Sequence, residues 1–396
     1  MMRLLFKVLH ATGLWCLLVR CGMLLSRLIP LRNDSGMFFF FPCYHIGGAE
    51  KVHADIVACF AELTPWVIFT RKSHNTLYRD LFAKSARLFD LWFLGGLYPL
   101  SVGLAAGLVN RHENAVAFGC NNIFYYYLVP YLGDKVRKFD LTHAFDGLER
   151  YSLPVAHRLE ARVAINAKTV ADFAQQYRDH GLDARLMDRV VLIENRVEVA
   201  PALNLRPTGR PLQVLYVGRG TVEKRAHLVG RVARLCCGQG ATAPFTLVGR
   251  GLPEAVVADD HAYCRFTGEI HDAGQLQALY RDADVLLLTS SREGFPLVIM
   301  EAMGNGAIPI ATNVGGIAVH LRHGHNGFLV DGADEERIVR EMSVLLIDLA
   351  TNVETREQVS QAAYRYACEH FSPEGFCAGY RNLLLPAGAG AGKGRT

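Results

Sequence analysis

The sequence predicts an α/β protein built from two doubly wound parallel sheets. Short apolar runs of three to six residues alternate along the chain with longer segments of mixed polarity. Continuous apolar strands between helices are typical of parallel sheets that are covered on both faces. The 396 residues are too many for one compact domain of this class and suit two domains, each with its own core.

Nine apolar runs are the predicted strands, at residues 37–41, 66–69, 115–118, 163–165, 190–193, 212–217, 245–248, 285–288 and 308–311. After the fifth run the pattern stops, and residues 199–211 contain three prolines. This break predicts a linker at 204–211 between a first domain at 36–203 and a second at 212–385. The low-complexity end, residues 386–396, is predicted to be disordered.

The composition excludes several classes of protein. Hydrophobic residues make up 51% and charged residues 20%, which excludes disorder for all but the ends. The 42 basic and 38 acidic residues are too balanced for a nucleic-acid-binding protein. The ten cysteines are scattered and form no CxxC pair, so they are predicted to be reduced thiols of a cytoplasmic protein rather than disulfides or zinc ligands.

Residues 1–35 form an apolar, basic extension whose role the residues leave open. Charges such as Lys7, Arg20 and Arg27 interrupt the apolar run, so no membrane span is predicted there. Three interpretations remain: a helix on an anionic membrane surface, a signal peptide, or a helix packed on the first domain. A second apolar stretch, residues 91–109, is interrupted by Gly95, Gly96 and Pro99 and is predicted to be a buried helix.

Residues 284–330 carry the most informative pattern, in which a buried strand leads through a loop into a helix. Pro296 suits the first helical position, and the free N–H groups at the helix start predict a site for a diphosphate. The residues of that site are Gly294, Phe295, Pro296, Leu297 and Val298. Glu293 and Glu301 place two carboxylates where they can face one ligand, although a glutamate near a helix start is also favoured by the helix dipole alone.

A second phosphate-facing pattern lies upstream, where residues 212–225 give a strand, a glycine turn at Gly218 and a basic helix start. The stretch lacks the third glycine of GxGxxG, so a dinucleotide fingerprint is disfavoured. The neighbouring Arg225 can be interpreted as a solvated residue on the surface of a helix, without a role in binding.

The stretch at 284–330 closely resembles the E-x7-E signature of the retaining GT-B glycosyltransferases of family 4, with Gly315, Gly316 and Gly327 following it. The resemblance implies two facing Rossmann-like domains with the active site in the cleft between them. It also implies that Glu293 contacts the donor sugar, that Glu301 holds the nucleotide ribose, and that Arg219 and Lys224 clamp the pyrophosphate.

The same resemblance extends to segments with weaker signals. Residues 266–270, FTGEI, resemble the segment that lines the nucleobase pocket, which implies roles for Gly268 and Ile270. The GGAE run resembles the first loop of the family and assigns the donor phosphates to Gly47 and Gly48. His143 falls where many members keep a histidine that reaches the donor sugar. Asp140 could steer that imidazole or could be a turn residue at a strand end.

The function expected from this resemblance is transfer of a sugar from a nucleotide-diphosphate sugar to a saccharide or lipid-linked acceptor, at the cytoplasmic face of a membrane. No cofactor and no metal site is expected, because Arg219 and Lys224 replace a cation and no DxD-like dyad follows a strand. Nucleic acid is not an expected partner. Two rivals stay open: a sugar-nucleotide epimerase or phosphorylase of the same fold, and a non-catalytic sugar-nucleotide binding module.

Overall fold

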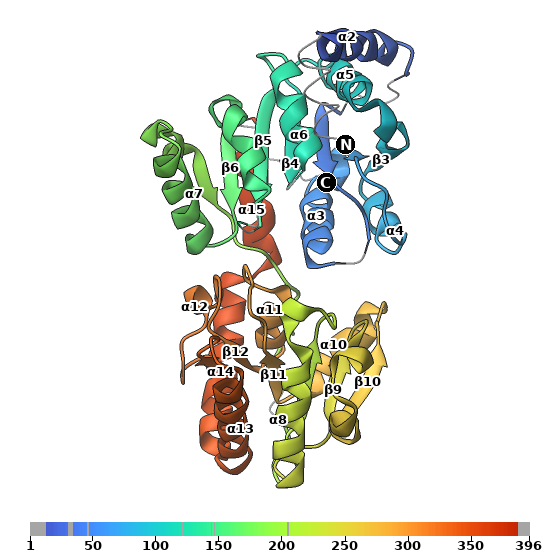
Figure 1. The fold of residues 1–396 in the computed structure, drawn as a ribbon. Helices are drawn as coiled ribbons and strands as arrows, with labels where there is room; N and C mark the ends of the chain where they lie inside the picture. Colours follow the sequence, from blue (N-terminus) through green and yellow to red (C-terminus); the bar gives the residue numbers. More distant parts are fainter. Residues whose placement is uncertain are drawn as a thin grey trace, which may run out of the picture. The chain divides into compact units, whose positions relative to one another are not determined.

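The computed structural model describes residues 13–30, 35–45, 47–120, 122–143, 145, 147–203 and 206–386. The chain forms two compact units (Figure 1). The described residues of the first unit fall within 13–165, 169–193 and 377–386, and those of the second fall within 166–168 and 194–376. Within the predicted extension, residues 1–12 and 31–34 lie outside the described residues, as does the predicted tail apart from Pro386.

The boundary between the units differs from the predicted linker at 204–211. The chain enters the second unit at Glu194, and it returns to the first unit at Cys377. The N–H group of Val197 donates to the carbonyl of Phe371 at 3.2 Å, and that of Ala200 donates to the carbonyl of Gly304 at 2.9 Å. The segment before residue 204 therefore belongs to the second unit, because its backbone groups are bonded there.

The described residues of the first unit form a seven-stranded parallel sheet in the order β3-β2-β1-β4-β5-β6-β7. Its strands are β1 (Met37–Phe41), β2 (Trp66–Phe69), β3 (Arg87–Asp90), β4 (Val116–Cys120), β5 (Arg137–Thr142), β6 (Ala161–Ala164) and β7 (Val190–Leu192). The phenylalanines of β1 alternate between the faces. Phe38 and Phe40 pack in the same core as α5 and α6, whereas Phe39 packs against Phe60 and Phe118 on the other face.

The helices of the first unit cover both faces of this sheet, which gives three layers. They are α2 (Leu14–Ser26), α3 (Gly48–Ala58), α4 (Arg79–Ala83), α5 (Tyr98–Val109), α6 (Ile123–Leu128), α7 (Ala167–Asp179) and α15 (Pro373–Leu384). The apolar stretch at 91–109 is split into a 3-10 segment, η2 (Trp92–Leu97), and the helix α5. Helix α5 is largely buried as predicted, whereas Phe93 and Leu97 are exposed.

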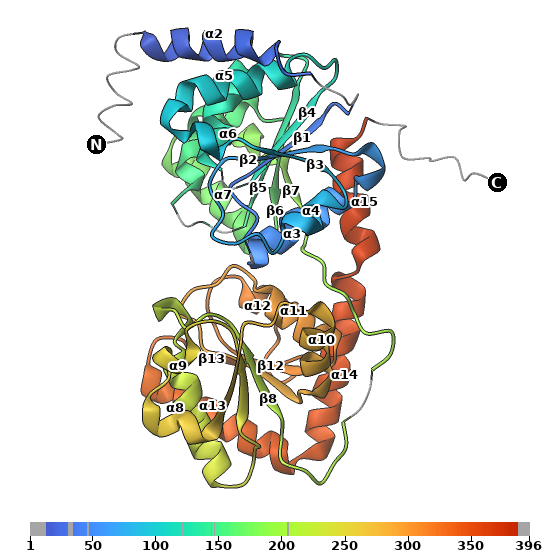
Figure 2. The same cartoon turned by 90° about the vertical axis from the view of Figure 1, so that its right-hand side faces the viewer.

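Helix α2 lies along α5 on the outside of the first unit (Figure 2). Of the three interpretations of the extension, packing on the first domain therefore holds for residues 14–26. Across the described segments, no helix combines the length and the apolar character needed to cross a bilayer.

The described residues of the second unit form a six-stranded parallel sheet in the order β10-β9-β8-β11-β12-β13. Its strands are β8 (Val214–Val217), β9 (Phe245–Val248), β10 (Cys264–Gly268), β11 (Val285–Leu288), β12 (Ile308–Thr312) and β13 (Phe328–Val330). Its helices are α8 (Ala226–Gly238), α9 (Leu252–Ala255), α10 (Ala273–Asp282), α11 (Leu297–Gly304), α12 (Ile317–His320), α13 (Glu335–Thr351) and α14 (Val353–His370).

Both faces of the second sheet are buried. Val285 and Leu287 of β11 pack in one core with α8 and α13, while Leu286 and Leu288 pack in another with α11 and α14. This alternation explains why the strand is a continuous apolar run in the sequence. All nine predicted strands are confirmed, with ends that move by at most two residues. Strands β3, β5, β10 and β13 had not been among the predicted runs.

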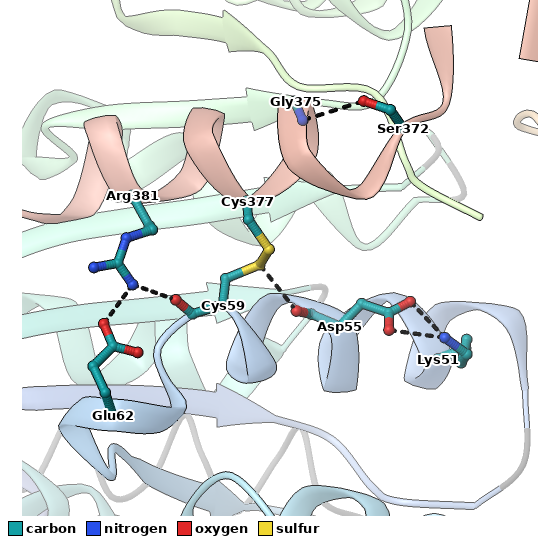
Figure 3. Close-up of a disulfide and its surroundings, with 8 residues drawn as sticks. All are labelled: Lys51, Asp55, Cys59, Glu62, Ser372, Gly375, Cys377 and Arg381. Atoms are coloured by element: carbon teal, nitrogen blue, oxygen red, sulfur yellow. Dashed lines mark hydrogen bonds and ion pairs between the residues drawn. A yellow bond between two sulfur atoms is a disulfide. The ribbon is translucent and has the colours of Figure 1, made fainter. Parts of the chain in front are cut away.

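The prediction that every cysteine is a free thiol is wrong for two of them. Cys59, which caps the end of α3, forms a disulfide with Cys377 in α15, 318 positions away in the sequence (Figure 3). Arg381 lies beside it, donates to the carbonyl of Cys59 at 2.7 Å and pairs with Glu62. Spacing carries no signal for such a bridge, because only the return of α15 to the first unit brings the two residues together. The other eight cysteines are free.

Candidate functional site

Each sheet has a point at which the strand order reverses. In the second unit the chain builds β8, β9 and β10 on one side and then continues with β11 next to β8. The loops that follow β8 and β11 therefore start at the place where doubly wound sheets commonly bind their ligands, the carboxyl ends of the strands at the reversal. In the first unit the same reversal lies between β1 and β4. The predicted site residues lie in the segments that follow these strands or their neighbours.

Two predicted residues from different loops are in contact in the second unit. Lys224 ends a 3-10 segment after β8, η6 (Val222–Lys224), and Glu293 lies in the loop between β11 and α11. The Lys224 Nζ atom lies 2.5 Å from the Glu293 Oε1 atom. The side chains are 19% and 10% exposed, so this ion pair is screened much less than one on the surface. The pair places a cation and a carboxylate together at the switch point.

Arg225 is not the solvated residue that the sequence indicated. Its side chain is 8% exposed, and its guanidinium donates to the carbonyls of Thr289 (2.7 Å), Ser290 (3.0 Å) and Gly332 (3.0 Å). Its backbone is left-handed, with φ of 49°. Arg225 therefore holds the segment that follows β11, because a guanidinium can satisfy several carbonyls in one plane.

Two glycine turns, residues 218–220 and 249–251, pack directly on each other. The N–H of Gly218 donates to the Val248 carbonyl at 2.9 Å, and that of Gly220 donates to the Arg250 carbonyl at 2.8 Å. A Cβ atom on Gly220 would lie 1.7 Å from the carbonyl oxygen of Gly251, so only glycine allows this approach. The N–H groups of Gly218 and Gly220 are therefore both bonded within the fold. The turn at 218–220 can still contact an anion through the side chain of Arg219, which is exposed.

Glu301 lies on α11 and accepts a hydrogen bond from the buried hydroxyl of Tyr280 at 2.7 Å. Burial, and then the charge of Glu301, raise the pKa of Tyr280 well above 10, so the hydroxyl keeps its proton and remains a donor. Tyr280 therefore orients the carboxylate. Tyr280 was not among the predicted site residues, although its place near the end of the helix before β11 was a usable signal. Pro296 is the N-cap of α11 rather than its first residue.

A turn after β12 supports the loop that carries Glu293. Gly315 has a φ of 61°, and a Cβ atom there would lie 1.6 Å from the carbonyl oxygen of Glu293. The N–H of Gly316 donates to the carbonyl of Gly294 at 2.7 Å. Phe295 is buried against His320, with ring centroids 4.2 Å apart. These contacts hold the loop in one conformation before any ligand binds.

The remaining predicted residues of the second unit lie around the same sheet edge. Gly268 ends β10, and its carbonyl accepts from the N–H of Gly249 at 2.9 Å. Three further predicted residues pack, partly buried, against the core that contains α11 and α14: Ile270, Leu297 and Val298.

In the first unit, Gly47 is the N-cap of α3 and Gly48 is its first residue. Glu50 covers this turn. Its carboxylate is 3.5 Å from the Cys43 sulfur, which donates to it, and 3.5 Å from the Nε2 atom of His45. Burial, followed by the charge of Glu50, raises the pKa of the Cys43 thiol to about 12. Cys43 is therefore a protonated thiol at neutral pH.

His143 follows β5, and its Nε2 atom lies 3.1 Å from the Nε2 atom of His53 on α3. His53 is buried and stacks on Phe41, with ring centroids 4.2 Å apart. Burial lowers the pKa of His143 to about 4, while burial and then His143 lower that of His53 well below 6.5. Both rings are neutral at pH 7, so one Nε2–H donates to the other ring. The sulfur of Cys120 lies within 4.8 Å of a ring nitrogen of each histidine.

The suggestion that Asp140 steers His143 is wrong. Asp140 is fully buried, and its carboxylate pairs with Arg162 at 2.7 Å and accepts from the hydroxyl of Tyr126 at 3.0 Å. The residue that positions His143 is His53. The sequence analysis missed His53 because contact between α3 and the end of β5 is a long-range feature of the fold.

Comparisons with known proteins identify relatives of part of the chain and of its fold. Residues 204–366 match a family model described as glycosyl transferases group 1. A D-inositol 3-phosphate glycosyltransferase from Corynebacterium urealyticum is 34% identical over 96 residues, which cover 24% of this chain and 23% of that protein. One from Rhodococcus opacus is 31% identical over 246 residues, which cover 57% and 54%. The chain therefore spans about a quarter and about half of the length of these relatives.

Among solved structures, Anabaena Alr3699/HepE in complex with UDP superposes on the chain with a TM-score of 0.69. The match covers 88% of this chain and 99% of the other at 18% sequence identity, so it concerns the fold alone. Residues 204–366 thus match the group 1 glycosyl transferases, and the two parallel-sheet units have the GT-B fold.

Proposed function

We propose that the chain is a retaining glycosyltransferase of family 4 that moves a sugar from a nucleotide-diphosphate sugar to a saccharide or lipid-linked acceptor. The observation that carries the proposal is the contact between Lys224 and Glu293 at the switch point of the second unit, with Glu301 held by Tyr280 on the helix that follows. The match of residues 204–366 to the group 1 glycosyl transferases and the names of the curated relatives support it.

The residues divide the work of the reaction by their chemistry. Departure of a nucleoside diphosphate leaves negative charge on its phosphate oxygens, and interactions that strengthen with this charge accelerate the step. Arg219, Lys224 and the N-terminus of α11 supply that stabilisation. Glu293 holds the donor sugar, and Glu301 accepts hydrogen bonds from the ribose. The family resemblance assigns His143 to the donor sugar, and burial keeps its ring neutral.

Lys224 is paired with Glu293 in the structure, so binding of the donor has to rearrange this contact. A diphosphate competes with the carboxylate for the ammonium group, and Glu293 is then released toward the sugar hydroxyls. Glu293 therefore becomes available to bind the sugar when a diphosphate occupies the phosphate site. No metal ion is needed in this scheme, because two cationic side chains neutralise the diphosphate.

The acceptor and the location follow from the N-terminal sequence rather than from the family match, which lies within residues 204–366. An apolar and basic extension favours a lipid-linked or cell-envelope acceptor at the cytoplasmic face of a membrane.

Binding of a panel of UDP-, GDP- and ADP-sugars, measured by thermal shift, tests the donor site. A ligand that binds only the folded chain raises its melting temperature. We expect one nucleotide class to stabilise the wild type and to lose this effect in Glu301→Ala and Lys224→Ala. Glu341→Ala, which removes a half-buried glutamate from an ion pair on α13, is the matched control and should retain the shift.

Product analysis separates transfer from its rivals. NMR of the product should show the anomeric configuration of the donor, and turnover should persist in EDTA. Nucleotide release that needs no acceptor would favour an epimerase or phosphorylase. Binding without any turnover would favour a non-catalytic module. Loss of activity in EDTA would direct attention to the group formed by His53, His143 and Cys120.

A further inference from the structure

Helix α2 is held tightly on the first unit by one face only. Its buried residues recur every three or four positions and are Trp15, Val19, Gly22 and Ser26. A Cβ atom on Gly103 of α5 would lie 1.9 Å from the carbonyl oxygen of Val19, so the two helix backbones touch. The indole of Trp15 donates to the hydroxyl of Tyr131 at 2.8 Å. The helix is thus a fixed part of the unit (Figure 2).

The opposite face of α2 is apolar although it faces solvent. The leucines that define this leucine face, with their exposed fractions, are Leu14 (41%), Leu17 (57%), Leu24 (58%), Leu25 (44%) and, just past the helix end, Leu28 (79%). Single exposed leucines are ordinary on protein surfaces, but a contiguous group marks an interaction site. Phe93 and Leu97, in the segment before α5, are also exposed.

Two arginines border the leucine face. Arg20 and Arg27 are exposed and lie seven positions apart, so they share one edge of the helix, just as Leu17 and Leu24 share the adjacent stripe. Residues 1–33 contain five basic residues and no acidic residue. The surface therefore combines exposed apolar area with positive charge, which is the chemistry that binds anionic lipid headgroups and the acyl boundary beneath them.

We infer that the leucine face of α2, with its arginine edge, rests on an anionic membrane surface. A 13-residue helix is about 20 Å long and cannot cross a hydrocarbon core of about 30 Å, so it lies in the plane of the interface. A second copy of the chain fits less well, because a two-fold contact pairs this face with itself, and a face bordered only by arginines offers its own copy no opposite charge. The docked helix holds the first unit at the bilayer, where a lipid-linked acceptor of the proposed function is found.

Cosedimentation of the full chain with vesicles tests this inference. Phosphatidylcholine vesicles with and without phosphatidylglycerol are compared at low and high salt. We expect binding to the anionic vesicles that weakens with salt. Leu17→Gln/Leu24→Gln should lower the partition constant about a hundredfold, roughly tenfold for each leucine. Arg20→Gln/Arg27→Gln should lower it about fivefold for each arginine and reduce the salt dependence.

The control is Leu77→Gln/Leu235→Gln, which changes two leucines that are 44% and 43% exposed elsewhere on the chain and should bind vesicles as the wild type does. Absence of wild-type binding to anionic vesicles would overturn the inference, as would equal binding by the α2 leucine variant. A dimer that this variant dissociates, together with no vesicle binding, would assign the face to a second copy. The nucleotide-sugar thermal shift of the α2 variant reports separately on the proposed function.

Discussion

Lys224 and Glu293 meet at 2.5 Å although 69 positions separate them in the sequence. Each residue follows one of two neighbouring strands, β8 and β11, whose carboxyl ends lie side by side at the switch point. Contact between the two side chains therefore follows from the sheet topology. It links a residue expected to hold phosphate with one expected to hold sugar.

Removal of one partner of this pair should destabilise the second unit, because the other charge is then left partly buried without compensation. We expect Lys224→Met to cost about 1–3 kcal/mol, a value between those of exposed and fully buried pairs. The double variant Lys224→Met/Glu293→Leu should recover part of this loss. Urea unfolding of the two single variants and the double variant gives the coupling energy. Strictly additive effects would mean that the pair contributes nothing to the ligand-free state.

Tyr280→Phe should weaken nucleotide binding without unfolding the chain. The ring stays buried, but Glu301 loses the hydroxyl that orients it, and a hydrogen bond to a charged group contributes about 1.5–3 kcal/mol. We expect the dissociation constant for the stabilising nucleotide to rise roughly tenfold or more, measured by calorimetry. Tyr364→Phe, which removes a hydroxyl bonded to a backbone carbonyl in the same unit, is the control. Equal affinities for wild type and Tyr280→Phe would contradict an orienting role.

Arg219 and Arg225 should separate binding from stability. Arg225→Ala leaves three carbonyls of the second unit without their donor and should cost about 2–4 kcal/mol of unfolding free energy. Arg219→Ala changes an exposed side chain and should alter stability by less than about 0.5 kcal/mol while it weakens diphosphate binding. Melting temperatures with and without nucleotide measure both effects. The opposite assignment, with Arg219 structural and Arg225 dispensable, would refute the proposed roles.

Stability should fall as the pH drops below 6.5. The pKa of His143 is about 4 in the fold, below the 6.5 of the unfolded chain, so the unfolded chain binds more protons between these values. Stability is therefore full above pH 6.5 and is lost as the pH falls toward 4, by up to about 1.4 kcal/mol per pH unit for each such histidine. His320, whose pKa is also lowered to about 4, adds to this slope.

The measurement is urea unfolding at several pH values between 5 and 7. His143→Asn and His320→Asn should each flatten the slope below pH 6.5, and the double variant should flatten it further. An unchanged slope in both single variants would show that these rings do not remain neutral in the fold.

The disulfide should stabilise the first unit, because it ties α15 to α3 across 318 sequence positions and restricts the unfolded chain. We expect reduction, or Cys59→Ser/Cys377→Ser, to lower stability by about 2–4 kcal/mol. The oxidised chain, denatured without reductant, should show eight thiols, and the reduced chain should show ten. Ten thiols in the unreduced protein would mean that the bridge does not form where the chain is made.

Much of the fold could be predicted because buried parallel strands are continuous apolar runs. β1 and β11, with residues buried on both faces, were located to the residue. Three of the four strands that the pattern did not reveal have polar positions, among them β3, which is RLFD and only half-buried, and β5, which is RKFDLT with the buried ion pair of Asp140. Hydropathy cannot identify such strands, because their polar side chains are satisfied by partners distant in sequence.

By itself the sequence determined the two-unit α/β architecture, the glycine turns and the loop residues at the strand ends, because these depend on local periodicity and backbone conformation. Only the tertiary structure decided which side chains meet. It paired Lys224 with Glu293 and joined Cys59 to Cys377. It also placed His53 beside His143 and buried Arg225 against the segment after β11. The physical reason is that such contacts depend on how strands are ordered in a sheet and where the last helix returns, which no local pattern encodes.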